Sequence, residues 1–346
     1  MSGIADHDAD AAPDADAGLF GLPTTADEAR LVIVPVPWDA TTSYRPGTAR
    51  GPAAIRTASH QLDLYDVDLG EPWREGIAML DIPDEVLRWN LNARTDAERV
   101  IAVGGRIGND PGLAAALARV NDAGARLNRH VYETVDRYLR AGKLVGVVGG
   151  DHSVPFGAIA RVAESVDEFG ILHFDAHCDL RDGYEGFEWS HASIMFNVIR
   201  KIPQVTKLVQ VGIRDFAKRE ADVVAASAGR IVVHHDAQLA ERGFAGESWR
   251  DICDSIVEQL PRKVYISFDI DGLDPKLCPS TGTPVPGGLS FQQAMYLVKR
   301  VAQAGITIVG FDLNEVVPGA GDDEWDANVG ARVLYKLCGW TLRSQR

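Results

Sequence analysis

The stretch from His173 to Asp179 reads His-Phe-Asp-Ala-His-Cys-Asp. It constrains the fold and the chemistry of this chain more than any other stretch. It follows the apolar run Phe169–Leu172, which is typical of a buried strand. Side chains two residues apart in a strand point to the same face, so we expect Asp175, His177 and Asp179 to converge where the strand ends. Two carboxylates and an imidazole held close together are unfavourable without a neutralising partner. Oxygen and nitrogen ligands of this kind predict a divalent cation such as Mn, Ni, Zn or Fe.

Composition and charge limit the kinds of molecule that this protein can be expected to bind. The chain has 346 residues, of which 46% are hydrophobic, and this is ordinary for a globular protein with a large core. The formal net charge of −14 argues against nucleic acid and anionic membranes, and is compatible with a small cationic substrate. No apolar run approaches the ~20 residues of a membrane span, and the first residues show no basic start followed by an apolar core. We therefore expect a cytoplasmic protein without a membrane partner.

Apolar runs alternate with helical patterns along the chain. The expected strands are 31–37, 76–82, 143–148, 169–172, 208–213, 230–233, 264–271 and 306–312, and the expected helices are 53–61, 113–141, 154–165, 191–201, 219–228, 248–260, 291–304 and 327–342. Because the strands are continuously apolar, we predict an α/β fold, a three-layer sandwich with a central, mainly parallel sheet. Residues 1–18 are expected to be a disordered acidic tail, and residues 19–346 a single domain. Residues 83–112, with an insertion-like Trp89–Asn92, give no clear pattern.

Three stretches place metal-type ligands at the ends of expected strands. They contribute His152, then Asp175, His177 and Asp179, then Asp269 and Asp271. The carboxyl ends of parallel strands meet at one edge of the sheet, so all six side chains are expected there. Six ligands are too many for one ordinary transition-metal site, and two ions ~3.5–4 Å apart that share carboxylates fit better. Each motif alone also occurs as a plain turn or cap; the three together favour a metal centre.

These motifs resemble those of the ureohydrolases, the arginase/agmatinase superfamily, and the resemblance runs from about Leu31 to Trp340. The stretches GGDHS, DAHxD and SFDIDGLDP carry it. It implies an arginase-like fold and two divalent ions, Mn²⁺ or in some members Ni²⁺. By motif, the ligands of one ion would be His152 and Asp179, those of the other His177 and Asp271, and the bridging carboxylates Asp175 and Asp269. It also implies a homo-oligomer, either a trimer or a hexamer, with a hetero-oligomer as an alternative.

Two further residues resemble catalytic positions of that family. His191 matches a histidine that transfers a proton to the leaving amine, although a plain helix N-terminal histidine is the alternative. Glu315 matches a carboxylate that grips the guanidinium in a paired contact, although a solvated loop glutamate is the alternative. The implied reaction is hydrolysis of a guanidinium C–N bond, which releases urea and an amine or ammonia.

The loop 181–190 is expected to decide which guanidino compound is used. Its aromatic residues Tyr184, Phe187 and Trp189 would either close a small substrate pocket, attracting a cation to their ring faces, or pack in an oligomer interface. The loop lacks the Asn/Ser cluster of arginases, and His-Ala-Ser at 191–193 stands where agmatinases carry His-Gly-Thr. The pattern is most similar to the guanidine-hydrolase branch, whose members act on free guanidine or small alkylguanidines. Agmatine, 4-guanidinobutanoate and a metformin-type biguanide remain as alternative substrates.

Two other classes stay open. One is a deacetylase-like hydrolase with a single zinc ion, and the other is a catalytically silent subunit of a larger assembly. Among the remaining histidines, we interpret His173 as a core residue and the run 234–236, His-His-Asp, as the end of a strand. Metal analysis combined with a urea assay on a panel of guanidino compounds would separate these hypotheses.

Overall fold

A parallel sheet lies at the centre of the computed structural model, which describes residues 4, 7–12, 17–321 and 323–346. Within these residues the sheet has eight strands in the order β2-β1-β3-β8-β7-β4-β5-β6, and every neighbouring pair is parallel. The strands are β1 (Leu31–Val36), β2 (Ile77–Met79), β3 (Leu144–Gly149), β4 (Phe169–Phe174), β5 (Val205–Ile213), β6 (Ile231–His235), β7 (Lys263–Asp269) and β8 (Thr307–Asn314).

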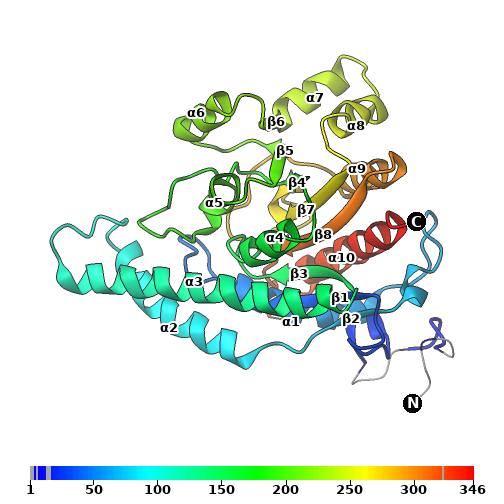
Figure 1. Cartoon of the computed structure of the whole chain (residues 1–346), viewed down its shortest axis with the longest axis horizontal. Coiled ribbons are helices and arrows are strands. Elements are labelled where there is room, and N and C mark those ends of the chain that lie inside the picture. Colours follow the sequence, from blue (N-terminus) through cyan, green and yellow to red (C-terminus); the bar gives the residue numbers. More distant parts are fainter. Residues whose placement is uncertain (1–3, 5–6, 13–16, 322) are drawn as a thin grey trace.

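Helices cover both faces of this sheet (Figure 1). They are α1 (Gly51–Ala58), α2 (Asp84–Ile101), α3 (Pro111–Arg140), α4 (Phe156–Ala163), α5 (Ile194–Lys201), α6 (Lys218–Ala226), α7 (Asp236–Phe244), α8 (Trp249–Val257), α9 (Phe291–Gln303) and α10 (Trp325–Arg343). The long helices α2 and α3 pack against each other and form a hairpin that projects beyond the sheet at the left of the view.

Alternation along the strands produces the three layers. In β1, Leu31 and Ile33 are buried in a core shared with α1, α9 and α10, whereas Val32 and Val34 are buried in a second core with α2 and α3. Successive strand residues point to opposite faces, so a continuously apolar strand fills both cores at once. The predicted three-layer α/β sandwich is thereby confirmed.

Two helices were missing from the sequence-based prediction. Residues 83–112, which gave no clear pattern, contain α2, and the insertion-like Trp89–Asn92 lies within this helix, which begins at Asp84 and carries acidic residues in its first turn. The following α3 begins after Asp110, whose carboxylate accepts hydrogen bonds from the backbone N–H groups of Gly112 and Leu113. The short α7 follows directly on β6, where the sequence analysis expected the end of a strand and assigned no helix.

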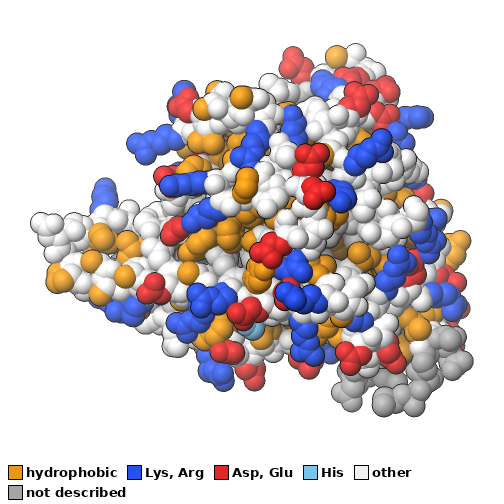
Figure 2. Space-filling model, in the orientation of Figure 1, with side chains coloured by type: hydrophobic (Ala, Val, Ile, Leu, Met, Phe, Trp, Pro, Cys, Tyr) orange, Lys and Arg blue, Asp and Glu red, His pale blue; other side chains and the backbone are white. Residues whose placement is uncertain are grey.

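Some predictions about the chain as a whole remain open. The predicted tail at residues 1–18 falls partly outside the described residues, so its disorder and the domain boundary at residue 19 stay predictions. Among the described helices, none is both long and apolar enough to cross a bilayer. Figure 2 shows Lys and Arg side chains interspersed with Asp and Glu over the face in view.

The sheet brings the predicted motifs to one edge. Four adjacent central strands, β3, β8, β7 and β4, end there, and each is followed by residues of those motifs. The turn after β3 is tight, since a Cβ at Gly150 would lie 1.9 Å from the carbonyl oxygen of Trp38. Only glycine permits this approach, and the next two residues, Asp151 and His152, then enter the site.

Candidate metal centre

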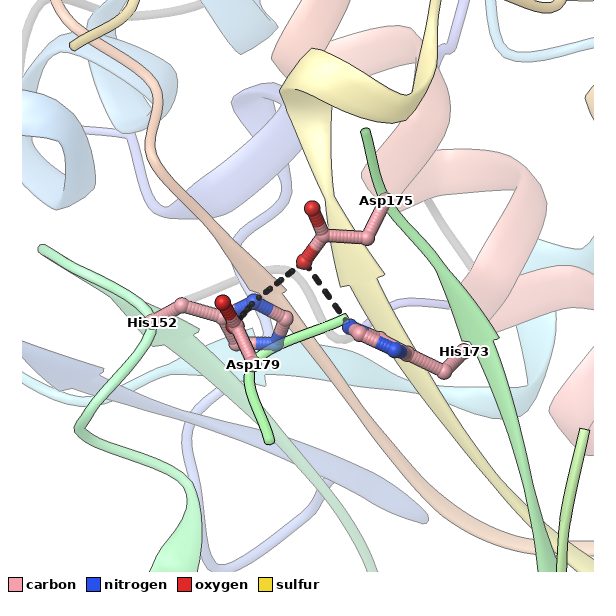
Figure 3. A group of neighbouring side chains, drawn as sticks. All are labelled: His152, His173, Asp175 and Asp179. Carbon is pink, nitrogen blue, oxygen red and sulfur yellow. Dashed lines mark hydrogen bonds and ion pairs between the residues drawn. The ribbon is translucent and has the colours of Figure 1, made fainter. Parts of the chain in front are cut away.

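A first cluster of metal-type ligands surrounds the ring of His152. Its Nδ1 lies 3.1 Å from Oδ2 of Asp175, 3.3 Å from Oδ2 of Asp179 and 3.2 Å from Oδ2 of Asp269. The four side chains come from the ends of β3, β4 and β7 and are buried. Figure 3 shows three of them with their side chains turned toward a common point. One nitrogen and three carboxylate oxygens at such distances form a donor set that suits a divalent ion.

A second cluster lies beside the first and shares Asp175 with it. Nδ1 of His177 is 3.1 Å from Oδ2 of Asp271 and 3.4 Å from Oδ1 of Asp175. Asp175 therefore presents one oxygen to each cluster, which is the geometry of a bridging carboxylate. Asp269 sits next to Asp271, whose backbone N–H donates to Oδ1 of Asp269 at 2.8 Å. The structure thus brings together all six residues that the motifs single out.

The clustered carboxylates of the two sites would be stabilised by bound cations. Burial, reinforced by the charge of Asp175, raises the pKa of Asp179 to about 7. Burial and the neighbouring carboxylates of Asp271 and Asp175 raise the pKa of Asp269 well above its ordinary value. His177 is only half-buried, and the same two carboxylates raise its pKa well above the usual range. The raised pKa values mean that protons neutralise the clusters when no metal is bound. Divalent ions would replace these protons, so the donor set fits two such ions.

The backbone that carries these ligands is not the one we expected. β4 ends at Phe174, so Asp175, His177 and Asp179 follow the strand and do not share one strand face. Asp179 reaches the first cluster because its φ is 54°, a left-handed conformation that non-glycine residues adopt rarely. Glu315 has a φ of 64° in the turn after β8. Backbone of this kind concentrates at functional sites, where the surrounding structure holds it in place.

Glu315 lies over the two clusters and is almost fully buried. Its Oε1 accepts a hydrogen bond of 2.9 Å from the backbone N–H of His152, and its own N–H donates to the carbonyl oxygen of Gly150 at 2.8 Å. Burial and the charges of Asp269 and Asp151 raise the pKa of Glu315 well above its ordinary value. A buried carboxylate among other carboxylates would be stabilised by a cationic ligand.

His191 faces the same space from the start of the short 3₁₀ turn His191–Ser193. Burial and the charges of His177 and His152 lower the pKa of His191 to about 4. Its Nδ1 is buried and has no hydrogen-bond partner within the described part of the chain. At neutral pH the ring is therefore neutral and can accept a proton in the cavity.

A cavity of ≈ 210 Å³ connects these groups to the surface. Its inner wall is formed by ligands of both clusters together with His191 and Glu315. The more exposed lining residues, which mark its mouth, are Ser43, Arg181, Tyr184, Asp215 and Thr283, and the buried Glu220 lies beside Arg181. A larger cavity of ≈ 380 Å³ lies between α8, α9 and α10, but no cluster of metal-type ligands among the described residues lines it. Chemistry, rather than size, identifies the smaller cavity as the candidate active site.

The comparison with known proteins decides the family. The model of the arginase family matches residues 29–339, which is nearly the whole ordered fold. The chain belongs to the arginase family. The predicted resemblance is confirmed, and this arginase-family protein is a metal-dependent hydrolase that acts on guanidino groups. The match argues against the alternative of a deacetylase-like hydrolase with one zinc ion.

Curated relatives and solved structures agree with this assignment. The N(1)-aminopropylagmatine ureohydrolase of Thermus thermophilus is 34% identical over 301 residues, which cover 87% of each chain. The guanidinobutyrase of Pseudomonas aeruginosa is 26% identical over 324 residues, which cover 91% of this chain and 87% of that one. The structure of proclavaminate amidino hydrolase from Streptomyces clavuligerus has a TM-score of 0.73 at 23% identity, over 96% of this chain and 99% of that one. That last likeness supports the fold alone.

Two of the three aromatic residues assigned to the substrate do not reach the cavity of this arginase-family protein. Phe187 is fully buried in a separate core with residues of α2 and α3 such as Val100 and Val120. Trp189 packs against Phe156, with ring centroids 4.8 Å apart, and lies under the Nζ of Lys201. Neither Phe187 nor Trp189 lines the cavity, and their packing against neighbouring helices does not support the predicted contact with the substrate. Tyr184 does line the cavity.

Several residues of the site gave no signal in the sequence. Thr283 lines the cavity, and its Oγ1 donates to Oδ2 of Asp271 at 3.3 Å. Nε2 of His152 bonds to Oγ of Ser267 at 2.9 Å, which leaves Nδ1 free for a metal. Such partners come from other strands, so only the strand register reveals them. The pattern Ser-x-Asp-x-Asp at 267–271 could have indicated Ser267 as a partner of the site, because its side chain shares a strand face with Asp269.

Proposed function

We propose that this arginase-family hydrolase cleaves free guanidine or a small alkylguanidine, with two Mn²⁺ or Ni²⁺ ions bound at the paired clusters. The proposal rests chiefly on one observation, the position of Arg181 at the mouth of a small cavity. The reaction adds water to the guanidinium carbon and breaks one C–N bond. Guanidinium and water then give urea and ammonium, or an alkylammonium ion.

The chain's own residues have distinct tasks in this reaction. Two divalent ions, when bound, would lower the pKa of a water molecule so that it attacks near neutral pH. Glu315 pairs with the planar guanidinium and holds its carbon above the clusters. His191 is neutral at neutral pH, so it takes a proton at the cavity and returns it to the departing nitrogen. The surrounding burial keeps bulk water away from these groups.

The mouth of the cavity favours a substrate without a second positive charge. The guanidinium of Arg181 stands 5.0 Å from the centroid of the Tyr184 ring, and its Nε is 3.7 Å from Oε2 of Glu220. Glu220 is already engaged, because its two oxygens accept the backbone N–H groups of Leu180 and Ala217. A compound with a cationic tail, such as agmatine, would bring its ammonium group toward Arg181 and be repelled there, an effect that the carboxylates of Asp215 and Glu220 in the same lining oppose. Free guanidine and small alkylguanidines carry no such group.

A second candidate substrate is 4-guanidinobutanoate. The same Arg181 would attract its carboxylate, and a paired contact between guanidinium and carboxylate is geometrically favourable. The name of the Pseudomonas aeruginosa relative, guanidinobutyrase, describes an enzyme for a substrate of this type. Cavity size ranks this candidate second, because two ions and a guanidinium group already occupy much of ≈ 210 Å³.

A substrate panel tests the proposal. The protein would be loaded with Mn²⁺ or with Ni²⁺, and urea release measured from guanidine, methylguanidine, agmatine, 4-guanidinobutanoate, arginine and a biguanide. We expect guanidine or methylguanidine to have the highest kcat/KM. A higher value for agmatine would overturn the substrate assignment while leaving the family chemistry intact. No urea from any compound, with both metals bound, would favour the silent-subunit alternative.

A further inference from the structure

The ring of His173 lies beside the first cluster, yet both of its nitrogens are already engaged. Its Nε2 lies 2.8 Å from Oδ2 of Asp175, and its Nδ1 lies 2.8 Å from Nε2 of Gln210 (Figure 3 shows the first contact). All three side chains are fully buried. Gln210 belongs to β5, where it pairs in register with His173 on β4.

The amide orientation of Gln210 can be derived from a neighbouring backbone group. Its Nε2 also lies 2.7 Å from the carbonyl oxygen of Cys178, which can only accept a hydrogen bond. The group that faces this carbonyl must therefore be the NH₂, and the same NH₂ faces Nδ1 of His173. A flipped amide would set two oxygens against each other. The correct orientation leaves Oε1 of Gln210 buried without a partner among the described atoms, a cost that the two donated bonds offset.

This orientation fixes the tautomer of His173. Because Nδ1 accepts from Gln210, the proton of a neutral ring resides on Nε2 and is donated to Oδ2 of Asp175. A protonated Nε2 has no lone pair for a metal, and Nδ1 faces away from the cluster. His173 therefore cannot act as a metal ligand in this arrangement, although it lies within reach of the ligands His152 and Asp179.

We propose that Gln210 and His173 are positioning residues that set the rotation of the bridging carboxylate of Asp175. The hydrogen bond from His173 holds Oδ2 on the side of His152, so Oδ1 must face His177. Gln210 holds His173 in turn and ties the carbonyl of Cys178, between two ligands, to β5. Neither residue lines the cavity, so their effect on the reaction is exerted through the metal centre. The inference does not depend on which guanidino compound is the substrate.

The first test reads the tautomer directly. In metal-free protein labelled with ¹⁵N-histidine, long-range ¹H–¹⁵N spectra at neutral pH distinguish a ring protonated on Nε2 from one protonated on Nδ1. The signal absent from His173→Phe identifies His173 among the nine histidines. We expect a neutral ring with the proton on Nε2. A ring protonated on Nδ1, alone or together with Nε2, would overturn the proposal whatever the metal affinities of the variants.

The second test measures metal affinity by competition with a chromophoric chelator. His173→Phe keeps an aromatic ring but removes the donor, and should weaken binding by roughly 10–100-fold. Gln210→Glu keeps the size but presents an acceptor, so Nδ1 gains a proton and binding should weaken as well. Gln210→Met removes donor and acceptor at similar volume and should weaken binding less than Gln210→Glu. Wild-type affinity in Gln210→Glu together with a loss in Gln210→Met would mean a packing role and would overturn the proposal.

Discussion

Glu315 and His152 are joined by a hydrogen bond from the backbone N–H of His152 to Oε1 of Glu315, 2.9 Å long. This bond links the turn after β8 to the turn after β3, so the carboxylate that we propose to bind the substrate and a proposed metal ligand are held together. Because Glu315 is buried and positioned beforehand, its electrostatic interaction with a guanidinium is strengthened by the surroundings.

The first prediction concerns Glu315 and its hydrogen bond with His152. Glu315→Gln keeps the hydrogen bond from His152 through its amide oxygen but loses the negative charge that pairs with the guanidinium. We expect kcat/KM to fall by at least about 100-fold while two metal ions stay bound. Urea assays and metal analysis on the same sample check this. Glu71→Gln, at an exposed surface pair with Arg74, is the matched control and should leave both values unchanged. Undiminished turnover in Glu315→Gln would contradict the role assigned to Glu315.

The second prediction concerns specificity at the cavity mouth. Arg181→Gln removes the cation that repels a second positive charge, a term on the order of 1 kcal/mol at this exposure. The ratio of kcat/KM for agmatine to that for guanidine should therefore rise by about five-fold. Arg200→Gln, a more exposed arginine outside the cavity that pairs with Asp182, should leave the ratio unchanged. An unchanged ratio in Arg181→Gln would remove the electrostatic argument for a substrate without a second cation.

The third prediction concerns the loop that carries Tyr184. Phe187→Ala empties a site in the core between α2 and α3 and should lower the free energy of unfolding by roughly 3–5 kcal/mol. KM should rise, because Tyr184 and Phe187 exchange backbone hydrogen bonds across the loop. Urea denaturation and kinetics measure the two effects. Phe244→Ala, whose side chain is exposed, should change stability by less than about 0.5 kcal/mol. Wild-type stability in Phe187→Ala would contradict the anchoring role.

The metal-type ligands were predictable from the sequence, although for a partly wrong reason. Apolar strands in a βα alternation imply a parallel sheet, and a parallel sheet gathers its strand ends on one edge. This argument predicts that His152, Asp175 and Asp269 lie close together, and it needs no atomic detail. The period of two along β4 does not explain Asp179, which depends on a left-handed residue beyond the strand. Local sequence does not specify such a backbone.

The aromatic loop and the buried polar partners were not predictable in the same way. The burial of Phe187 depends on the hairpin of α2 and α3, whose first helix gave no clear pattern in the sequence. His173 was interpreted as a core residue, and it is buried, but its polar role depends on Gln210 in the neighbouring strand. The pairing between β4 and β5 sets that contact, and one chain read alone does not give the register.

The fourth prediction concerns pH and a histidine outside the site. His234 lies near the end of β6, as predicted, and burial with the charges of Arg242 and His235 lowers its pKa to about 4. Between pH ~6.5 and ~4 the unfolded chain binds a proton that the folded chain does not, so stability falls as pH falls through this window.

His234→Gln removes this contribution, and its amide can still bond to Gln259. The stability difference between pH 7 and pH 4 should shrink by on the order of 2 kcal/mol relative to wild type. Urea denaturation across that range measures it. His130→Gln, at a half-buried position of α3 beside Trp89, is the control. An equal pH dependence in wild type and His234→Gln would contradict the lowered pKa.

The number of metal ions bound per chain tests the account most directly. Metal-free protein would be loaded with Mn²⁺ or Ni²⁺, freed of excess ion and analysed for metal, alongside Asp175→Asn. Because Asp175 presents one oxygen to each cluster, we predict two ions per chain in wild type and fewer in the variant. One ion per chain in wild type, or two tightly bound ions in Asp175→Asn, would contradict the paired centre.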